Sequence, residues 1–251
     1  HRDRYTYQRA LSTSVWSATF GRHLGLDRVG IRQLALGGLL LDVGKTRLPP
    51  ALLENPNRLS SHEIAQLKQH VELGLEIIDE RADVPNEVRN MVHSHHERYN
   101  GEGYPQGLQG AQIPLFGRLA GVVDTYDRLT TPRPYTECRS PHDAINMLYD
   151  CRDVEFQGEL VEQFIQAVGI FPTGTLVELS TGEVGVIISL NGARRLRPRI
   201  MLILDKDKRP YRRFTELDLM EQEQDSDGNL LNVKKGLAPG AYGIDPDNLF
   251  L

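Results

Sequence analysis

The chain has 251 residues, with 29 Lys and Arg against 34 Asp and Glu and a formal net charge of −5 at pH 7. This length allows one or two domains with a real core, and the acidic balance gives no general attraction to a nucleic acid polymer. The two cysteines, Cys138 and Cys151, are too few for a disulfide framework or a zinc ribbon. Reduced thiols are typical of the cytoplasm, where we expect the protein.

No apolar run approaches the roughly 20 residues of a membrane-spanning helix, so we expect no membrane insertion. The sequence begins at His1 rather than Met, and we expect a fragment whose N-terminal part is missing.

Residues 1–171 have the apolar spacing of helices, which predicts a helical domain. The third helix has the clearest start, because Ser60 followed by Glu63 forms a capping box. We predict helices over residues 5–23, 27–43, 60–78, 85–95, 118–129, 140–151 and 159–168.

Residues 172–251 change to the period of two that is typical of strands. We interpret 205–213 as a charged turn and 222–240 as a loop. Strands are predicted over residues 175–179, 184–189 and 199–204. The predicted fold is therefore mostly α, a helical bundle over 1–171 followed by a small antiparallel β domain over 172–251.

The run from His95 to Pro105 carries the strongest chemical signal, HHERYNGEGYP. Two adjacent imidazoles suit a transition metal, because neutral histidine is the commonest protein ligand. The turn after them places an aromatic ring on a permissive backbone. Further candidate ligands on other predicted helices are Asp42, His70 and Asp124. A bundle that brings them together would suit Mn, Fe, Ni or Zn and could activate water for phosphoester hydrolysis.

With these residues in this order, the chain resembles the HD-GYP subgroup of the HD phosphohydrolases, which hydrolyses cyclic di-GMP. The resemblance covers about residues 3–170 and implies an HD-type helical bundle. Its most specific motifs are Gly103-Tyr104-Pro105 and Arg133-Pro134-Tyr135. The β segment resembles one that follows this domain in some bacterial members.

The resemblance also implies a role for each matching residue. Asp42 matches an aspartate that bridges two metals, and Lys45 a lysine that contacts the scissile phosphate, so these two are the implied catalytic residues. The implied metal ligands are Asp42, His70, His95, His96 and Asp124. The implied ligand-binding residues are Lys45, Arg118, Arg133 and Tyr135. Gly103, Tyr104 and Pro105 form the signature loop, which is implicated in folding, ligand access and contacts with GGDEF-domain proteins.

Two positions depart from the family pattern, and both fall on the same metal. Leu41 and Arg9 stand where the family has histidines. Leucine has no lone pair, and arginine has only donors. At about 4 Å and an effective dielectric near 20, like unit charges cost roughly 4 kcal/mol, and a divalent ion about twice that. We therefore predict one divalent ion, or none, rather than two, and we expect Arg9 to pair with Asp42 or Asp124.

These observations favour a divergent HD-GYP domain with weak or no phosphodiesterase activity that acts by binding cyclic di-GMP or a GGDEF-domain protein. The alternative is an active metal-dependent phosphodiesterase that gives pGpG or GMP. A nucleotidase of the wider HD superfamily fits less well with the two specific motifs. Taken alone, His70 also fits a core histidine and Lys45 a solvated lysine past a helix end. A homodimer is compatible with either function.

Overall fold

The computed structural model describes residues 4–54, 59–81, 83–132, 138–169, 171–191 and 197–244. It divides into two compact units. The helical unit comprises His1–Thr136 and Met147–Ala167, and the sheet unit comprises Glu137–Asn146 and Val168–Leu251. Helix α8 (Pro141–Asp150) crosses this division. The boundary between residues 171 and 172 stays a prediction.

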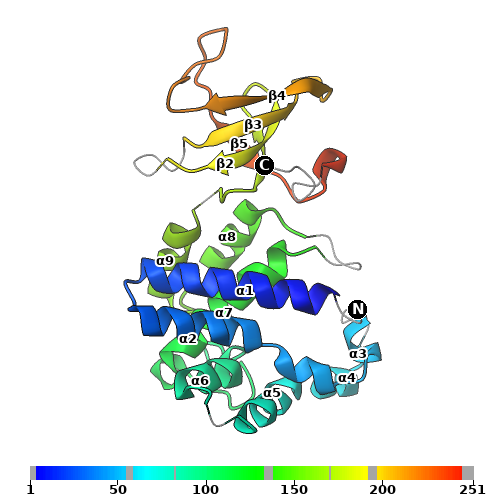
Figure 1. Ribbon diagram of the computed structural model, residues 1–251, viewed down its shortest axis with the longest axis vertical. Helices are drawn as coiled ribbons and strands as arrows, with labels where there is room; N and C mark the ends of the chain where they lie inside the picture. Colours follow the sequence, from blue (N-terminus) through cyan, green and yellow to red (C-terminus); the bar gives the residue numbers. More distant parts are fainter. Residues whose placement is uncertain are drawn as a thin grey trace. The chain divides into compact units, whose positions relative to one another are not determined.

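The helical part of the chain confirms the expected mostly-α class (Figure 1). The other α-helices are α1 (Arg4–His23), α2 (Arg28–Leu40), α3 (Ala51–Glu54), α4 (Ser61–Lys68), α5 (His70–Asp79), α6 (Asn86–Ser94), α7 (Leu115–Thr130) and α9 (Gly158–Val168). Two short 3-10 helices are η1 (Val43–Arg47) and η3 (Gly110–Gln112).

The predicted helices differ from the structure by up to three residues at their ends, and two of them differ in ways that bear on the site. The helix predicted over 27–43 ends at Leu40, so that Asp42 stands in the turn before η1. The helix predicted over 60–78 is two helices, because the chain turns at Gln69 between α4 and α5. The capping box of Ser60 and Glu63 is present as predicted. The apolar spacing continues through the break and therefore could not reveal it.

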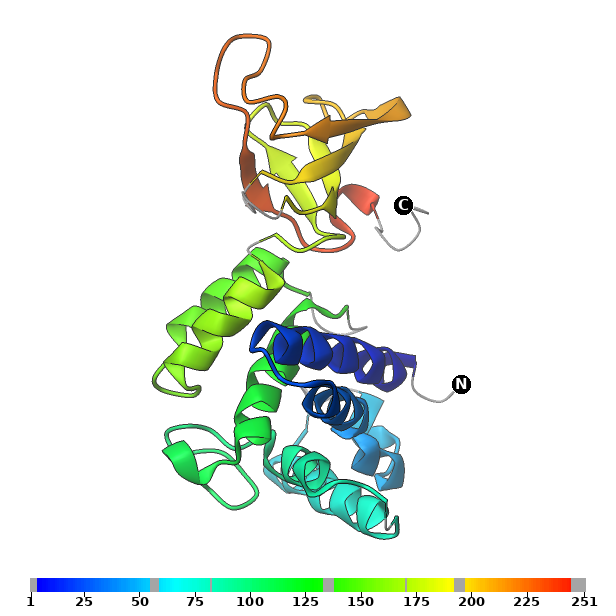
Figure 2. The ribbon, with the colours of Figure 1, turned by 60° about the vertical axis from the view of Figure 1, so that its left-hand side comes forward.

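Helices α1 and α2 lie side by side, as Figure 2 shows, because small residues let their backbones approach. Thr13 Oγ1 donates to the Gly38 carbonyl at 2.7 Å, and Ser14 Oγ donates to the Ala35 carbonyl at 2.8 Å. A Cβ atom on Gly38 would lie only 2.7 Å from the backbone carbonyl oxygen of Thr13. This contact brings the N-terminal half of α1 next to the end of α2, where Asp42 lies.

Helix α7 is the centre of the helical unit. Every residue from Leu119 to Asp127 is buried. Tyr126 packs edge-on against Trp16 at 5.4 Å and against Phe164 at 5.3 Å between ring centroids. A helix buried all round must pair any carboxylate that it carries, and α7 carries Asp124 and Asp127.

The sheet unit holds a five-stranded antiparallel sheet with strand order β4-β3-β2-β1-β5. The strands are β1 (Leu176–Leu179), β2 (Val184–Ser189), β3 (Arg199–Leu204), β4 (Pro210–Asp218) and β5 (Val233–Gly236). Apolar residues pack on both faces, with Val177, Leu179 and Ile200 in one cluster and Leu176, Val186 and Ile203 in another. The predicted antiparallel β domain is confirmed.

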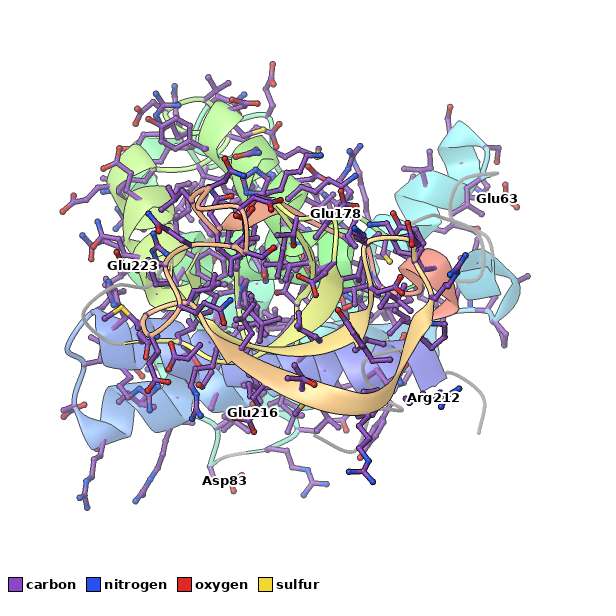
Figure 3. All side chains as sticks on the ribbon, turned by 90° about the horizontal axis from the view of Figure 1, so that it is seen from above. Glu63, Asp83, Glu178, Arg212, Glu216 and Glu223 are labelled. Carbon is purple, nitrogen blue, oxygen red and sulfur yellow. The ribbon has the colours of Figure 1, made fainter. Side chains whose placement is uncertain are left out.

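Two sequence interpretations in this unit are wrong in part. The charged turn at 205–213 leads into β4 at Pro210, and the loop at 222–240 contains β5. Most of β4 is exposed, including Arg212 and Glu216, which Figure 3 labels. Edge strands of this kind lack the apolar alternation that a sequence pattern detects. Among the described residues, no helix has the length and apolar character needed to cross a membrane.

Candidate metal centre

Four predicted ligands converge in the helical unit. Asp42, His70, His95 and His96 each offer one ligand atom, and these atoms lie within 4.8 Å of one another. Asp42 comes from the turn after α2, His70 begins α5, and the two adjacent histidines follow the last turn of α6. We call these four residues the histidine cluster. Its formation from three separate segments agrees with the prediction that a bundle would bring them together.

A close backbone contact places Asp42 against His70. A Cβ atom on Gly44 would lie 1.9 Å from the His70 carbonyl oxygen and 2.4 Å from the Gly74 nitrogen. Only glycine therefore lets η1 lie directly on the first turn of α5. The resulting distance between Asp42 Oδ1 and His70 Nε2 is 3.5 Å.

Backbone carbonyls fix the tautomers of two cluster histidines. Nδ1 of His70 lies 2.7 Å from the Leu67 carbonyl, and Nδ1 of His95 lies 2.7 Å from the Val92 carbonyl. A carbonyl only accepts, so each Nδ1 carries the proton and each Nε2 keeps a lone pair. Burial lowers the pKa of both imidazoles, that of His95 to about 4, which keeps them neutral at pH 7.

The ligand atoms that keep a free lone pair lie close to one another. The buried atoms Asp42 Oδ1, His70 Nε2 and His95 Nε2 have no hydrogen-bond partner among the described residues. Unpaired acceptors that converge in a buried site are costly unless a cation joins them. One carboxylate oxygen with three imidazoles is a donor set that suits Mn, Fe, Ni or Zn. The residues present therefore fit a single divalent ion.

His96 completes the cluster in a different way. Its ring stacks on Tyr104 with centroids 4.7 Å apart and planes 27° apart, and it lies 4.0 Å from the ring of His95. Burial lowers its pKa well below the ordinary value, so this imidazole is also neutral at pH 7. The signature loop thus borders the cluster directly.

On the other side of Asp42, the side chain of Arg9 contacts three carboxylates. Nη1 lies 3.2 Å from Asp42 Oδ2, Nη2 lies 2.5 Å from Asp124 Oδ1, and Nε lies 2.9 Å from Asp127 Oδ2. The side chain of Arg9 is about 5% exposed. We call these four residues the Arg9 network. The expected pairing of Arg9 with Asp42 or Asp124 is confirmed for both.

Arg9, together with Lys45 at Asp42, holds two carboxylates ionised. Burial acts to raise the pKa of Asp42, but Lys45 and Arg9 outweigh it and hold this pKa well below the usual range. Burial acts in the same sense on Asp124, and Arg9 again lowers that pKa below its ordinary value. For Asp127, burial dominates, and its pKa is raised.

Asp42 is shared between the two halves of the site. Its Oδ1 faces the histidine cluster, while its Oδ2 accepts from both Arg9 Nη1 and Lys45 Nζ, the latter at 2.7 Å. Asp124, a predicted ligand, is outside the four residues whose ligand atoms converge, and its Oδ1 accepts from Arg9. Its role as a metal ligand stays a prediction. Leu41 is buried, with 2% of its surface exposed.

The predicted ligand-binding residues lie in different places. Lys45 is in the site, whereas Nη1 of Arg118 donates to Gln157 Oε1 at 2.6 Å. Arg133 and Tyr135 lie outside the described residues. The ligand-binding roles of all four stay predictions.

The sequence interpretation missed two buried acids. Asp127 anchors Arg9 and also accepts from the hydroxyls of Ser12 and Thr131. Its spacing of three residues from Asp124 on an apolar helix was a usable signal. Glu97 accepts from the backbone N–H groups of Gln106 and Leu108 at 2.7 and 2.9 Å. Its position directly after two candidate ligands was the only hint in the sequence.

Known proteins resemble this chain in both of its parts. A family model described as HD domain matches residues 2–160, and one described as KOW domain associated with HD domain matches 176–224. A cyclic di-GMP phosphodiesterase of Pseudomonas aeruginosa is 33% identical over 198 residues, which are 79% of this chain and 48% of that protein. The 3'3'-cGAMP-specific phosphodiesterase 2 of Vibrio cholerae is 32% identical over 128 residues, 51% of this chain and 24% of its own length.

A solved HDG"Y"P protein from Bdellovibrio bacteriovorus superposes with a TM-score of 0.55 at 22% identity, covering 65% of this chain and 52% of that one. This likeness supports the fold. The chain belongs to the HD domain family. Within it, the signature loop and the relatives reported above group the chain with HD-GYP domains. The chain spans less than half the length of the two phosphodiesterases named above.

Proposed function

We propose that this HD-GYP domain binds cyclic di-GMP at a site with one divalent ion and hydrolyses it weakly or not at all. The observation that carries the proposal is the contact of Arg9 with Asp42, Asp124 and Asp127. In the family pattern, two of these acids serve a metal on that side. Here a fixed guanidinium charge takes the place of that metal.

The electrostatics of the two halves support one ion rather than two. Arginine stays protonated at any physiological pH, so its charge cannot leave the network. A divalent ion on the same carboxylates would meet a like charge within a few ångströms, at a cost of several kcal/mol. The histidine cluster, in contrast, presents neutral nitrogen donors and one carboxylate oxygen. It can accept a divalent ion without displacing a protein cation.

The chemistry available to the chain follows from this arrangement. Asp42, His70, His95 and His96 would hold the ion, which when bound supplies a Lewis acid for a phosphoryl oxygen. Lys45, whose side chain is 18% exposed, adds a positive charge beside it, which suits a phosphodiester anion. Binding is thereby favoured. The pairing of Asp124 with Arg9 leaves this acid less able to help activate water.

Cyclic di-GMP is the proposed ligand because the most extensively aligned relative reported above is a phosphodiesterase for it. The similarity to a cGAMP phosphodiesterase makes 3'3'-cGAMP the alternative for the same site. A GGDEF-domain protein is a proposed partner at the signature loop, and the cytoplasm is the proposed compartment. An active phosphodiesterase remains the competing function.

Metal analysis of the purified chain tests the proposal together with a turnover assay. With Mn supplied in excess, we expect about one ion per chain, bound cyclic di-GMP, and little pGpG or GMP. Two ions per chain with rapid turnover would show that the Arg9 network does not exclude a metal. Cyclic di-GMP binding without any bound ion would overturn the one-metal site alone.

Restoring the histidines sharpens this test. The double variant Arg9→His with Leu41→His should bind a second ion and raise turnover, because it returns two imidazoles to the half that lacks them. Arg22→His is the matched control, since it changes an exposed arginine on the same helix. A double variant that behaves like this control would mean that another feature limits activity.

A further inference from the structure

Glu97 is a buried carboxylate that closes the signature loop. Only 4% of its surface is exposed. Its Oε1 accepts from Gln106 N at 2.7 Å and its Oε2 from Leu108 N at 2.9 Å. Gln106 follows the Gly-Tyr-Pro motif directly, and Leu108 comes after Gly107. One side chain thus ties down the two backbone amides that end the loop, and ionised acceptors make the stronger hydrogen bonds.

The other end of the loop rests on the same turn. A Cβ atom on Gly103 would lie 2.3 Å from Arg98 N and 2.5 Å from Glu97 Cα, so the loop backbone touches the chain just after the cluster histidines. The next amide, Tyr104 N, donates to the His96 carbonyl at 3.2 Å. The loop is therefore fastened on both sides of Tyr104 to residues 96–98.

This fastening fixes the ring of Tyr104 over His96. The two rings stack at 4.7 Å, and the ammonium group of Lys68 lies 4.7 Å from the centroid of the tyrosine ring. Stacked pairs of this kind prefer specific ring orientations. The position of Tyr104 thus depends on the loop that Glu97 holds.

His96 needs such a contact more than the other cluster histidines. His70 and His95 are oriented by carbonyls of their own helices through Nδ1. Among the described residues, the ring nitrogens of His96 make no corresponding hydrogen bond, and its ring is bordered by His70, His95 and Tyr104. A ligand without a hydrogen-bonded outer partner is free to rotate unless packing holds it.

We infer that Glu97 is a positioning residue of the metal centre. It holds the signature loop so that Tyr104 stacks on His96 and fixes the orientation of that ligand. The inference rests on the proposed one-ion site for its effect on metal affinity. The loop contacts themselves are hydrogen bonds and ring contacts within the chain.

Glu97→Gln tests whether Glu97 holds the signature loop, with Glu102→Gln as the matched control in the same loop. Glutamine has one acceptor oxygen, so one of the two amides must face an NH2 group. We expect amide hydrogen exchange at Gln106 and Leu108 to accelerate at least about tenfold and Mn affinity to fall about tenfold, in the range seen for outer-shell partners. Glu102 is exposed and accepts from Asn100, so its variant should change neither.

Two variants of Tyr104 separate positioning from general stability. Tyr104→Phe keeps the ring and should retain Mn affinity within about twofold, whereas Tyr104→Ala should lose about tenfold. The ring-current shift of the His96 proton signals should persist in Tyr104→Phe and vanish in Tyr104→Ala. Unchanged exchange in Glu97→Gln, or unchanged His96 signals in Tyr104→Ala, overturns the inference. If Mn binds to no variant, the one-ion site fails, while the exchange and ring-current results still decide the positioning role.

Discussion

The two halves of the site share one aspartate but solve opposite electrostatic problems. In the Arg9 network, buried acids face a cation that is part of the chain. In the histidine cluster, buried acceptor atoms have no partner among the described residues. The first half receives its counter-charge from the chain itself. The second is complete only when a cation arrives from solution.

Under the proposed one-ion site, this difference explains how a family site loses one metal and keeps its fold. Removing two histidines would leave the acids of α7 and Asp42 buried without a counter-charge. Arg9, which contacts all three acids, supplies that charge whether or not a metal is available. The histidine cluster keeps its geometry because its own supports, Gly44 and the carbonyls of Leu67 and Val92, lie elsewhere.

Breaking the Arg9 network should have the largest effect. Arg9→Met leaves Asp42, Asp124 and Asp127 without their shared cation, and loss of one partner from a buried ion pair costs about 3–5 kcal/mol of unfolding free energy. Chemical denaturation of metal-free protein at pH 7 measures this loss. Added Mn should recover part of it, because an ion could then neutralise the same acids.

Arg22→Met is the control for this change. Arg22 is exposed on the same helix, and surface substitutions are usually within about 0.5 kcal/mol. Equal stability of the Arg9 and Arg22 variants would show that the network is not the fixed half of the site that the contacts indicate.

The cluster residues could be predicted from the sequence because each sits near a helix end or on a helical stripe. The pairing of Arg9 was predictable from chemistry, since an arginine in place of a ligand must find the acids that the ligand served. The family resemblance supplied the register that joined distant positions such as Asp42 and His95. Local periodicity alone gave the helices but not their convergence.

What the sequence did not reveal depends on contacts between segments. The break at Gln69 turns His70 into the site, and no change of apolar spacing marks it. The role of Gly44 rests on its approach to His70, which no local pattern encodes. Strands β4 and β5 escaped notice because pairing with a neighbour, rather than burial of an alternating face, makes them strands.

Disturbing the contact between η1 and α5 should have an intermediate effect. Gly44→Ala places a methyl group where the His70 backbone stands, so η1 must move away from α5 and take Asp42 with it. Overpacking of this kind costs about 1–3 kcal/mol, and Mn affinity should fall with the loss of the shared carboxylate. Thermal unfolding and Mn titration of the same samples measure both effects.

Gly30→Ala is the control for Gly44→Ala. Its Cβ atom would meet the Asp27 side chain at 3.3 Å in the first turn of α2, where alanine is a better helix former than glycine. We expect equal or slightly higher stability and unchanged Mn affinity. A Gly44 variant with wild-type Mn affinity would show that Asp42 does not need the close packing of η1 on α5.

The smallest expected effect comes from a change that frees Asp42 from part of its contact on the Arg9 side and favours the histidine cluster. Lys45 shares Asp42 Oδ2 with Arg9, and its side chain is 18% exposed. Lys45→Met removes one of the two cations on that carboxylate, which makes Asp42 a better donor to an ion in the histidine cluster. A partly exposed ion pair contributes up to about 1 kcal/mol, so Mn should bind a few times more tightly.

Arg47→Met, which breaks exposed pairs with Glu76 and Glu80, should leave the affinity unchanged. Weaker Mn binding in the Lys45 variant would mean that Lys45 holds Asp42 in place for the ion rather than competing with it.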